Sequence, residues 1–292
     1  MERAGLFLHR FRTLGGNTNM KITVIGAGAM GGSLVEGLLK GETFQAGDIT
    51  VADPNEKRLE HFAKKGTSVT TENAVAAQGS DIVTVVVKPW LVEGVINEIK
   101  DVMDYKKQML IVIAAGIKSE QLNQWLKPEN IEPDFNSDPT ETSPILPYFL
   151  VIPNIAIAEK ASMTFIVPVG ANDEQTKKVK KIFDELGGSI ITEERLLPAG
   201  TTLASCGIAY AMRYVRASVE GGVELGFKAS DAEKIVLQTV KGAVELLQIT
   251  HQHPEEAIDQ VTTPGGVTIK GLNEMEHAGF TSAVIRGLKA GL

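Results

Sequence analysis

Three glycines near the start of the chain have the spacing of a phosphate-binding turn. Gly26, Gly28 and Gly31 follow the apolar run 20–25 and precede the segment 33–39, in which leucine and valine recur at helical spacing. A dinucleotide site needs a strand, a glycine turn and a helix in this order. The first glycine allows the tight turn, the second lets a pyrophosphate approach the backbone, and the third lets the helix pack closely on the strand. Although glycine clusters also occur in ordinary turns, this context predicts a dinucleotide site, with the first N–H groups of the helix facing the phosphates.

An acidic residue stands where such a site would meet the adenosine ribose. The run 48–53 predicts a second strand that ends at Asp53, at about the 20-residue distance from the glycines at which an acid binds a ribose 2′-hydroxyl. A carboxylate there favours NAD, because it would repel the additional phosphate of NADP. Lys57 and Arg58 follow and could compensate, so both NADH and NADPH stay open as cofactors. The alternative is that Asp53 only forms a turn before Pro54.

A second stretch that could do chemistry is 261–272, near the end of the chain. It contains a Pro-Gly-Gly turn that opens a predicted helix, so free backbone N–H groups are available for an anion such as a carboxylate. Thr263 and Thr268 add hydroxyl groups beside the turn. The alternative is an ordinary N-capped helix start.

The elements that must position the first site alternate between strand and helix. The apolar strand 81–87 ends at Lys88 and Pro89, and the strand 109–116 ends in small residues. This alternation predicts an α/β fold with a doubly wound parallel sheet. Ligands of such sheets bind outside the carboxyl ends of the strands, which places Lys88 and Pro89 where a nicotinamide ribose would lie, unless both belong to a plain loop.

The organisation of the chain follows from changes in composition. Residues 20–195 carry the strand and helix pattern and are predicted to form the dinucleotide-binding domain, interrupted at about 128–147 by a proline-rich surface insertion. We expect residues 1–19 to be a disordered extension. Their arginines also loosely resemble an organelle-targeting peptide. Residues 196–292 are predicted to form a helical domain.

Two predicted helices of this last domain are apolar on more than one side. Residues 201–226 and 231–248 carry apolar side chains around most of their circumference, and a bundle of this size has little interior to cover them. We therefore expect these helices to pack against the same helices of a second subunit, which predicts a homodimer.

Composition excludes several other classes of protein. The net charge of −7 gives no electrostatic reason to bind nucleic acid or an anionic membrane, and no apolar run reaches the roughly 18 residues of a membrane span. The single cysteine, Cys206, excludes an intrachain disulfide and a cysteine-based metal cluster. We expect no metal site, and we expect a cytoplasmic protein because a reducing compartment is compatible with one cysteine.

The run from Thr262 to Glu276, Thr-Thr-Pro-Gly-Gly-x-Thr-x-x-Gly-Leu-x-x-Met-Glu, resembles the signature of the pyrroline-5-carboxylate reductase family. Further segments occur in the family's order: 26–32, 87–89, 114–116, 153–154, 209–210 and 279–285. The resemblance covers the chain from Met20 to its end, apart from the insertion.

This resemblance implies a Rossmann-type domain followed by an all-α dimerisation domain, and the NAD(P)H-dependent reduction of 1-pyrroline-5-carboxylate to L-proline. Dimers of the family often assemble further. It implies that Thr268 hydrogen-bonds the ring nitrogen and that Thr263, Gly266 and Val267 hold the substrate carboxylate. The implied cofactor contacts are Gly26, Ala27, Gly28, Ala29, Met30, Gly31, Asn73, Val87, Lys88 and Pro89, with Ala115 and Asn154 near the nicotinamide.

The chain departs from the family's usual residues at Leu150, at Ile155 and Ala156, and across 206–208. These departures leave two alternatives open: a related reductase of another imine or carbonyl compound, and a nucleotide-binding regulatory protein that has lost catalysis.

Overall fold

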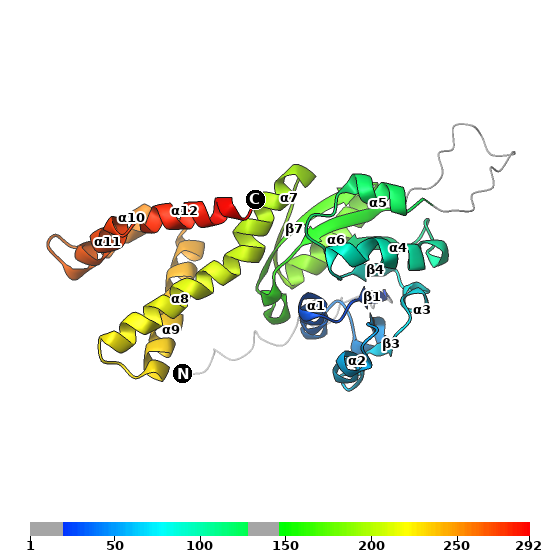
Figure 1. Ribbon diagram of the computed structural model, residues 1–292, viewed down its shortest axis with the longest axis horizontal. Helices are drawn as coiled ribbons and strands as arrows, with labels where there is room; N and C mark the ends of the chain where they lie inside the picture. Colours follow the sequence, from blue (N-terminus) through cyan, green and yellow to red (C-terminus); the bar gives the residue numbers. More distant parts are fainter. Residues whose placement is uncertain (1–19, 128–145) are drawn as a thin grey trace, which may run out of the picture. The chain divides into compact units, whose positions relative to one another are not determined.

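The computed structural model describes residues 20–127 and 146–292. The expected extension 1–19 and residues 128–145 of the expected insertion lie outside this part of the chain, whereas Leu146 and Pro147, which close the insertion, are buried. Two compact units meet in the sequence between Leu197 and Pro198. In Figure 1 the first unit runs from blue to green and the second from yellow to red.

An eight-stranded sheet forms the centre of the first unit. Its strands follow the order β3-β2-β1-β4-β5-β6-β7-β8. Their bounds are β1 Ile22–Ile25, β2 Ile49–Ala52, β3 Ser68–Thr70, β4 Ile82–Val85, β5 Met109–Val112, β6 Tyr148–Ile152, β7 Ser162–Val169 and β8 Gly187–Ile191. The first six strands are parallel and have the 3-2-1-4-5-6 order of a doubly wound dinucleotide-binding sheet, which confirms the predicted fold class.

One pair of strands in this sheet is antiparallel. β6 and β7 run in opposite directions, with Leu150 opposite Val167. The connection between them holds only a short 3₁₀ helix, η4 (Ile155–Glu159), followed by Lys160 in the left-handed region with φ of 56°. A parallel return needs a crossover of a dozen or more residues, so this short connection leaves only the antiparallel arrangement.

Helices of the first unit alternate with the strands. They are α1 Ala29–Lys40, α2 Glu56–Ala63, α3 Asn73–Ala77, α4 Val92–Ile99, α5 Ser119–Trp125 and α6 Asp173–Glu185. Shorter 3₁₀ turns are η1 Ala46–Asp48, η2 Pro89–Leu91, η3 Lys100–Val102 and η5 Glu194–Leu196. α4 thus has a 3₁₀ turn at each end.

The core of this unit forms where α1 packs on the sheet. Val24, Val51 and Ile82 of the central strands are fully buried, and Leu34 and Val35 of α1 belong to the same cluster. Burying one such side chain stabilises the fold by about 1.5–3 kcal/mol, so the apolar runs that predicted the strands also hold α1 against them.

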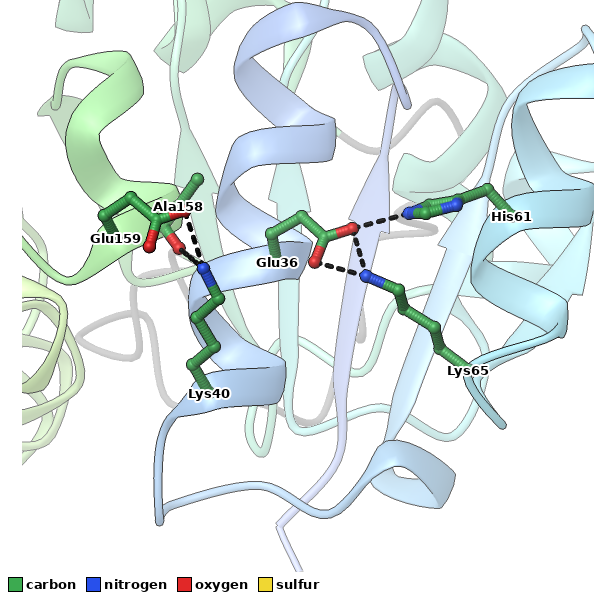
Figure 2. A network of polar contacts seen from close by, with 6 residues as sticks. All are labelled: Glu36, Lys40, His61, Lys65, Ala158 and Glu159. Atoms are coloured by element: carbon green, nitrogen blue, oxygen red, sulfur yellow. Dashed lines mark hydrogen bonds and ion pairs between the residues drawn. The ribbon is translucent and has the colours of Figure 1, made fainter.

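Ionic side chains fix the outer face of α1, as Figure 2 shows. The Glu36 carboxylate binds Lys65 Nζ at 2.6 Å and His61 Nε2 at 2.7 Å. Burial alone would raise the pKa of Glu36, but the hydrogen bonds from Lys65 and His61 hold it below the ordinary value. Lys40 reaches the other way and pairs with Glu159 at 2.7 Å. The helix that follows the glycine turn is thus tied to its neighbours on both sides.

The second unit is entirely helical. Its elements are α7 Leu197–Gly200, a π-helical segment Thr201–Cys206, α8 Gly207–Glu224, α9 Ala229–Thr250, α10 Pro254–Gln260, α11 Val267–His277 and α12 Phe280–Ala290. The single helix expected over 201–226 is therefore a π-helical segment followed by α8. The long helices α8 and α9 approach closely where Gly222 meets Ala232, and a methyl group at Gly222 would lie 3.0 Å from the Ala232 side chain.

Few side chains of this unit are buried. Ala232 is the one buried apolar side chain among residues 198–292, all of which the structure describes. Large apolar side chains on α8 and α9 are exposed instead: Tyr210, Met212, Tyr214, Val223, Ile235, Leu237, Val244, Leu246 and Ile249. In neither unit does the described chain contain a helix with the length and apolar character that crossing a membrane would require.

Candidate functional site

The carboxyl ends of the six parallel strands share one edge of the sheet, because parallel strands point the same way. The order of the strands reverses between β1 and β4, and dinucleotides bind outside the carboxyl ends at such a switch point. The residues predicted to bind the cofactor follow these strands one after another: Gly26 to Gly31 after β1, Asp53 after β2, Asn73 after β3, Val87 to Pro89 after β4, Ala115 after β5 and Asn154 after β6. The topology therefore brings the sequence-predicted cofactor residues to one edge.

The glycine turn is closed by contacts that exclude side chains. Gly26 has φ of +103°, and its N–H donates to the carbonyl of Ala52 at 2.7 Å. A methyl group at Gly26 would lie 2.3 Å from the carbonyl oxygen of Val86, and one at Gly31 would lie 1.8 Å from the carbonyl oxygen of Gly26. Two of the three glycines are thus required by the fold itself, as the motif predicts.

Gly28 is different, because it faces open space. A methyl group at Gly28 would meet no protein atom within 4 Å, and its backbone is extended, with φ of −71°. Gly28 is the N-cap of α1, where no side chain caps the helix and no acidic residue occupies the first turn. Uncapped N–H groups and an open approach suit an anion, so the residues present fit a pyrophosphate.

The Asp53 carboxylate is turned into the protein. Its side chain is 4% exposed, Oδ2 accepts the N–H of Ala27 at 2.8 Å, and Oδ1 accepts the N–H of Asn55 at 2.9 Å. Arg58 Nη1 lies 3.4 Å from Oδ2. Both carboxylate oxygens therefore accept hydrogen bonds from the backbone, and the contact of Asp53 with a ribose hydroxyl stays a prediction.

Asn73 is the first residue of α3, and its side chain is hydrogen-bonded to a residue that the sequence analysis did not identify. Its Nδ2 donates to Glu98 Oε2 of α4 at 2.7 Å. Within the part of the chain that the structure describes, the buried Asn73 Oδ1 has no hydrogen-bond partner. No local sequence signal identifies Glu98, since it meets Asn73 only through the packing of α3 on α4.

The segment after β4 lies beside the glycine turn because β1 and β4 are neighbouring parallel strands. Val86 N–H donates to the carbonyl of Ile25 at 2.8 Å. Val87 and Pro89 are partly exposed and Lys88 is exposed, so its ammonium group is accessible at this edge. The Lys88 backbone caps the 3₁₀ turn η2 that begins at Pro89.

The two residues expected near a nicotinamide have unlike surroundings. Ala115 is exposed and is followed by Gly116 with φ of +80°. Asn154 is 7% exposed, and its Oδ1 accepts the N–H of Ala156 at 3.0 Å. Its own N–H donates to Ser162 Oγ at 3.0 Å, a partner that the sequence did not indicate.

The departures from the family pattern are of different kinds. Leu150 lies inside β6 and is 2% exposed, so it is a core residue of the sheet. Ile155 begins η4 and is 47% exposed, whereas Cys206 ends the π-helical segment and is half-buried. The change at Leu150 therefore affects packing.

The Thr-Pro-Gly-Gly segment belongs to the second unit. Gly265 has φ of +69°, and Gly266 donates its N–H to the carbonyl of Thr263 at 3.0 Å. Gly266 is the N-cap of α11, without a side-chain cap, so the first N–H groups of the helix are uncapped. Val267 is 86% exposed, and Thr268 is half-buried in the first turn of the helix. The turn thus has the uncapped helix start that the sequence predicts for an anion.

Across residues 20–127 and 146–292, no group of three or more His, Cys, Asp or Glu side chains is placed to hold a metal ion.

Two family models match separate parts of the chain. Residues 194–292 match the model described as pyrroline-5-carboxylate reductase dimerisation. Residues 21–116 match the model described as NADP oxidoreductase, coenzyme F420-dependent. The first match contains the Thr-Pro-Gly-Gly segment, and the second contains the glycine turn.

Named relatives agree along most of the chain. Pyrroline-5-carboxylate reductase from Methanosarcina acetivorans is 33% identical over 92% of this chain and 95% of its own length. Pyrroline-5-carboxylate reductase 1 from Dictyostelium discoideum is 35% identical over 91% of this chain, which spans only 48% of that longer protein. Among solved structures, pyrroline carboxylate reductase from Plasmodium falciparum with NADP bound has a TM-score of 0.80 and 24% identity, covering 94% of this chain and 95% of that one.

Proposed function

Since this chain belongs to the pyrroline-5-carboxylate reductase family, we propose that it reduces 1-pyrroline-5-carboxylate to L-proline with a nicotinamide cofactor. The observation that carries the proposal is the presence of two glycine turns that open a helix without a side-chain cap, one in each unit: the turn before α1 and the Thr-Pro-Gly-Gly turn before α11. The first suits the pyrophosphate of a dinucleotide, and the second suits the carboxylate of a small substrate.

The reaction balances without a metal or a nucleophile. A bound dihydronicotinamide would supply a hydride to the imine carbon, which is C2 of the pyrroline ring and becomes C5 of proline. A proton would go to the ring nitrogen, so that the products are proline and the oxidised cofactor. Polarisation of the carbon–nitrogen double bond makes the imine carbon more electrophilic, so a hydrogen-bond donor near the nitrogen is the group that this chemistry needs most. Holding the two reactants together supplies much of the remaining acceleration.

Residues of the second unit would provide that donor and hold the substrate. In our proposal the Thr268 hydroxyl hydrogen-bonds the ring nitrogen. The Val267 N–H and the Thr263 hydroxyl bind the carboxylate, and Gly266 keeps that hydroxyl accessible because a methyl group at Gly266 would lie 2.4 Å from it. The uncapped start of α11 supports this assignment, because its N–H groups have no side chain to satisfy them.

The cofactor residues follow the edge described above. The N–H groups from Gly28 to Gly31 would face the pyrophosphate, Asn73 and Lys88 would contact the ribose and phosphate groups, and Ala115 and Asn154 would border the nicotinamide. The relative from Plasmodium falciparum carries NADP, so NADPH is a candidate for this chain together with NADH.

We propose that residues 20–195 form the dinucleotide-binding domain and that the chain acts as a homodimer through the helical domain 196–292. The exposed apolar side chains of α8 and α9 support this, because helices with so little cover in one chain gain stability by burying them against a second copy. A cytoplasmic location is the final part of the proposal and is compatible with the single cysteine.

The test is turnover by the purified full-length chain. The protein is incubated with 1-pyrroline-5-carboxylate and either NADPH or NADH, and both oxidation of the cofactor and formation of proline are measured. We expect the two to rise together in equal amounts. Binding of the cofactor without formation of proline would refute the proposal and would favour a regulatory protein on the same scaffold.

A further inference from the structure

The end of β2 carries a chain of contacts that runs from the glycine turn to the protein surface. The Ala27 N–H lies between Gly26 and Gly28 and donates to Asp53 Oδ2 at 2.8 Å. The same oxygen is 3.4 Å from Arg58 Nη1. One carboxylate therefore joins the phosphate-binding turn on its buried side to a guanidinium group in the first turn of α2.

The burial of Asp53 limits which groups its carboxylate can contact. The Asp53 side chain is 4% exposed and its second oxygen is taken by the N–H of Asn55. A residue that selects NAD must present its oxygen to the ribose at the surface of the site. Asp53 instead presents both oxygens to backbone N–H groups, and one of these belongs to the turn that would hold the pyrophosphate.

Arg58, unlike Asp53, has an exposed side chain. Its side chain is 53% exposed, so only one edge of the guanidinium faces Asp53. A guanidinium has five N–H donors in a fixed fork, which matches the oxygens of a phosphate. Arg58 follows β2 at the carboxyl edge of the sheet, which is the edge where the adenosine ribose of a dinucleotide binds.

The charges at this point do not exclude an additional phosphate. The carboxylate that would repel it is buried and faces a cation, and the exposed Lys57 adds a further positive charge to the same helix start. We propose that Asp53 is a positioning residue of the glycine turn, and that Arg58 selects NADPH over NADH by binding the 2′-phosphate. This inference rests on the proposed use of a nicotinamide cofactor and adds which of the two cofactors the site prefers.

The experiment measures dissociation constants of NADPH and NADH directly, from the change in dinucleotide fluorescence on titration with the full chain, without substrate. For Arg58→Gln we expect the affinity for NADPH to fall about 10- to 100-fold, the range for losing a hydrogen-bonded charge, while NADH changes less than about threefold. The NADPH affinity of the unaltered chain should also fall more steeply with salt than the NADH affinity, because the 2′-phosphate adds charge.

Two lysine variants serve as comparisons. Lys64→Gln removes a charge at the other end of the same helix, where the side chain is exposed, and should leave both affinities unchanged. Lys57→Gln tests the neighbouring cation. Equal NADPH affinity for Arg58→Gln and the unaltered chain, or a larger loss in Lys57→Gln, would overturn the assignment to Arg58.

Asp53→Asn separates positioning from ribose binding. The exchange replaces one of the two accepting oxygens with an N–H₂ donor, so either Ala27 N–H or Asn55 N–H loses its partner. We expect both cofactors to bind at least about tenfold more weakly, with their ratio preserved. Weaker NADH together with tighter NADPH would show that Asp53 contacts the ribose and would refute the positioning role.

If Asp53→Asn fails to fold, the Arg58 and lysine variants still decide which residue selects the cofactor. Dinucleotide binding is measured here without turnover, so the two proposals fail separately. A chain that binds NADPH through Arg58 but forms no proline contradicts the proposed reaction alone. A chain that forms proline with equal use of both cofactors contradicts the selection by Arg58 alone.

Discussion

Replacing Gly28 with alanine would separate folding of the glycine turn from binding of the cofactor. Gly28 has an extended backbone that alanine adopts freely, and a methyl group there would meet no protein atom within 4 Å. The other two glycines of the turn lack this freedom, because a methyl group on either would overlap a carbonyl oxygen. Any effect of Gly28→Ala on binding therefore comes from the ligand side of the turn.

Gly28→Ala should stabilise the fold slightly and weaken the binding of NADPH. Alanine at a compatible position stabilises by about 0.4–1 kcal/mol through the unfolded chain, which corresponds to a rise in Tm of at most a few degrees for a protein of this size. The methyl group would hold the pyrophosphate away from the N–H groups at the start of α1. Losing one hydrogen bond to a charged group costs about 1.5–3 kcal/mol, or about 10- to 100-fold in the dissociation constant of NADPH.

The assay combines a thermal melt with titration of NADPH. Gly94→Ala is the matched control, since Gly94 lies within α4, also has no protein atom within 4 Å of its added methyl, and is far in sequence from the turn. It should raise Tm slightly and leave the affinity unchanged. Gly31→Ala should lower Tm, because its methyl group would lie 1.8 Å from the Gly26 carbonyl oxygen.

Two results would refute this reasoning. If Gly28→Ala binds NADPH within about threefold of the unaltered chain, the pyrophosphate does not approach the backbone at Gly28. If Gly28→Ala lowers Tm as much as Gly31→Ala does, the space beside Gly28 is needed by the protein.

Three further predictions concern the second site, the subunit contact and the outer face of α1. Thr268→Ala should lower kcat about 10- to 100-fold with unchanged NADPH affinity while Thr268→Ser stays close to the unaltered enzyme, and equal kcat in all three would remove Thr268 from the reaction. Leu237→Asp on α9 should dissociate the dimer in analytical ultracentrifugation, whereas Leu91→Asp, equally exposed at 50% but in the first unit, should not; a Leu237→Asp dimer of unchanged stability would contradict the interface. Burial and its hydrogen-bond partners together leave the pKa of Glu36 below 4.5 in the folded state, so the stability that Glu36 contributes is complete above that pH and is lost as the pH falls. The Tm difference between the unaltered chain and Glu36→Gln, worth less than about 1 kcal/mol, should therefore shrink between pH 6 and pH 3. A constant Tm difference over this range would refute the role of the Glu36 ion pairs.

The parts of the fold that the sequence predicts are those set by local pattern. The glycine turn follows from the spacing of Gly26, Gly28 and Gly31, since two of these positions tolerate no side chain. The parallel strands β1, β4 and β5 follow from continuous apolar runs, because both of their faces are buried.

Features that depend on packing between distant segments were not predictable in this way. The antiparallel turn from β6 to β7 follows from a short connection whose geometry no periodicity expresses. The inward orientation of Asp53 depends on its hydrogen bond with the Ala27 N–H, and the position of the Asn73 side chain depends on its hydrogen bond to Glu98. In each case the residue type was visible in the sequence, whereas its partner was set by the fold.

The central claim is that hydride passes from the nicotinamide to the imine carbon of 1-pyrroline-5-carboxylate. It is tested most directly with NADPH carrying deuterium at C4 in either the R or the S position, followed by mass spectrometry of the product. We predict that one of the two labelled cofactors transfers one deuterium to C5 of proline and that the other transfers none. Proline without deuterium from both cofactors, or no proline at all, would contradict the account.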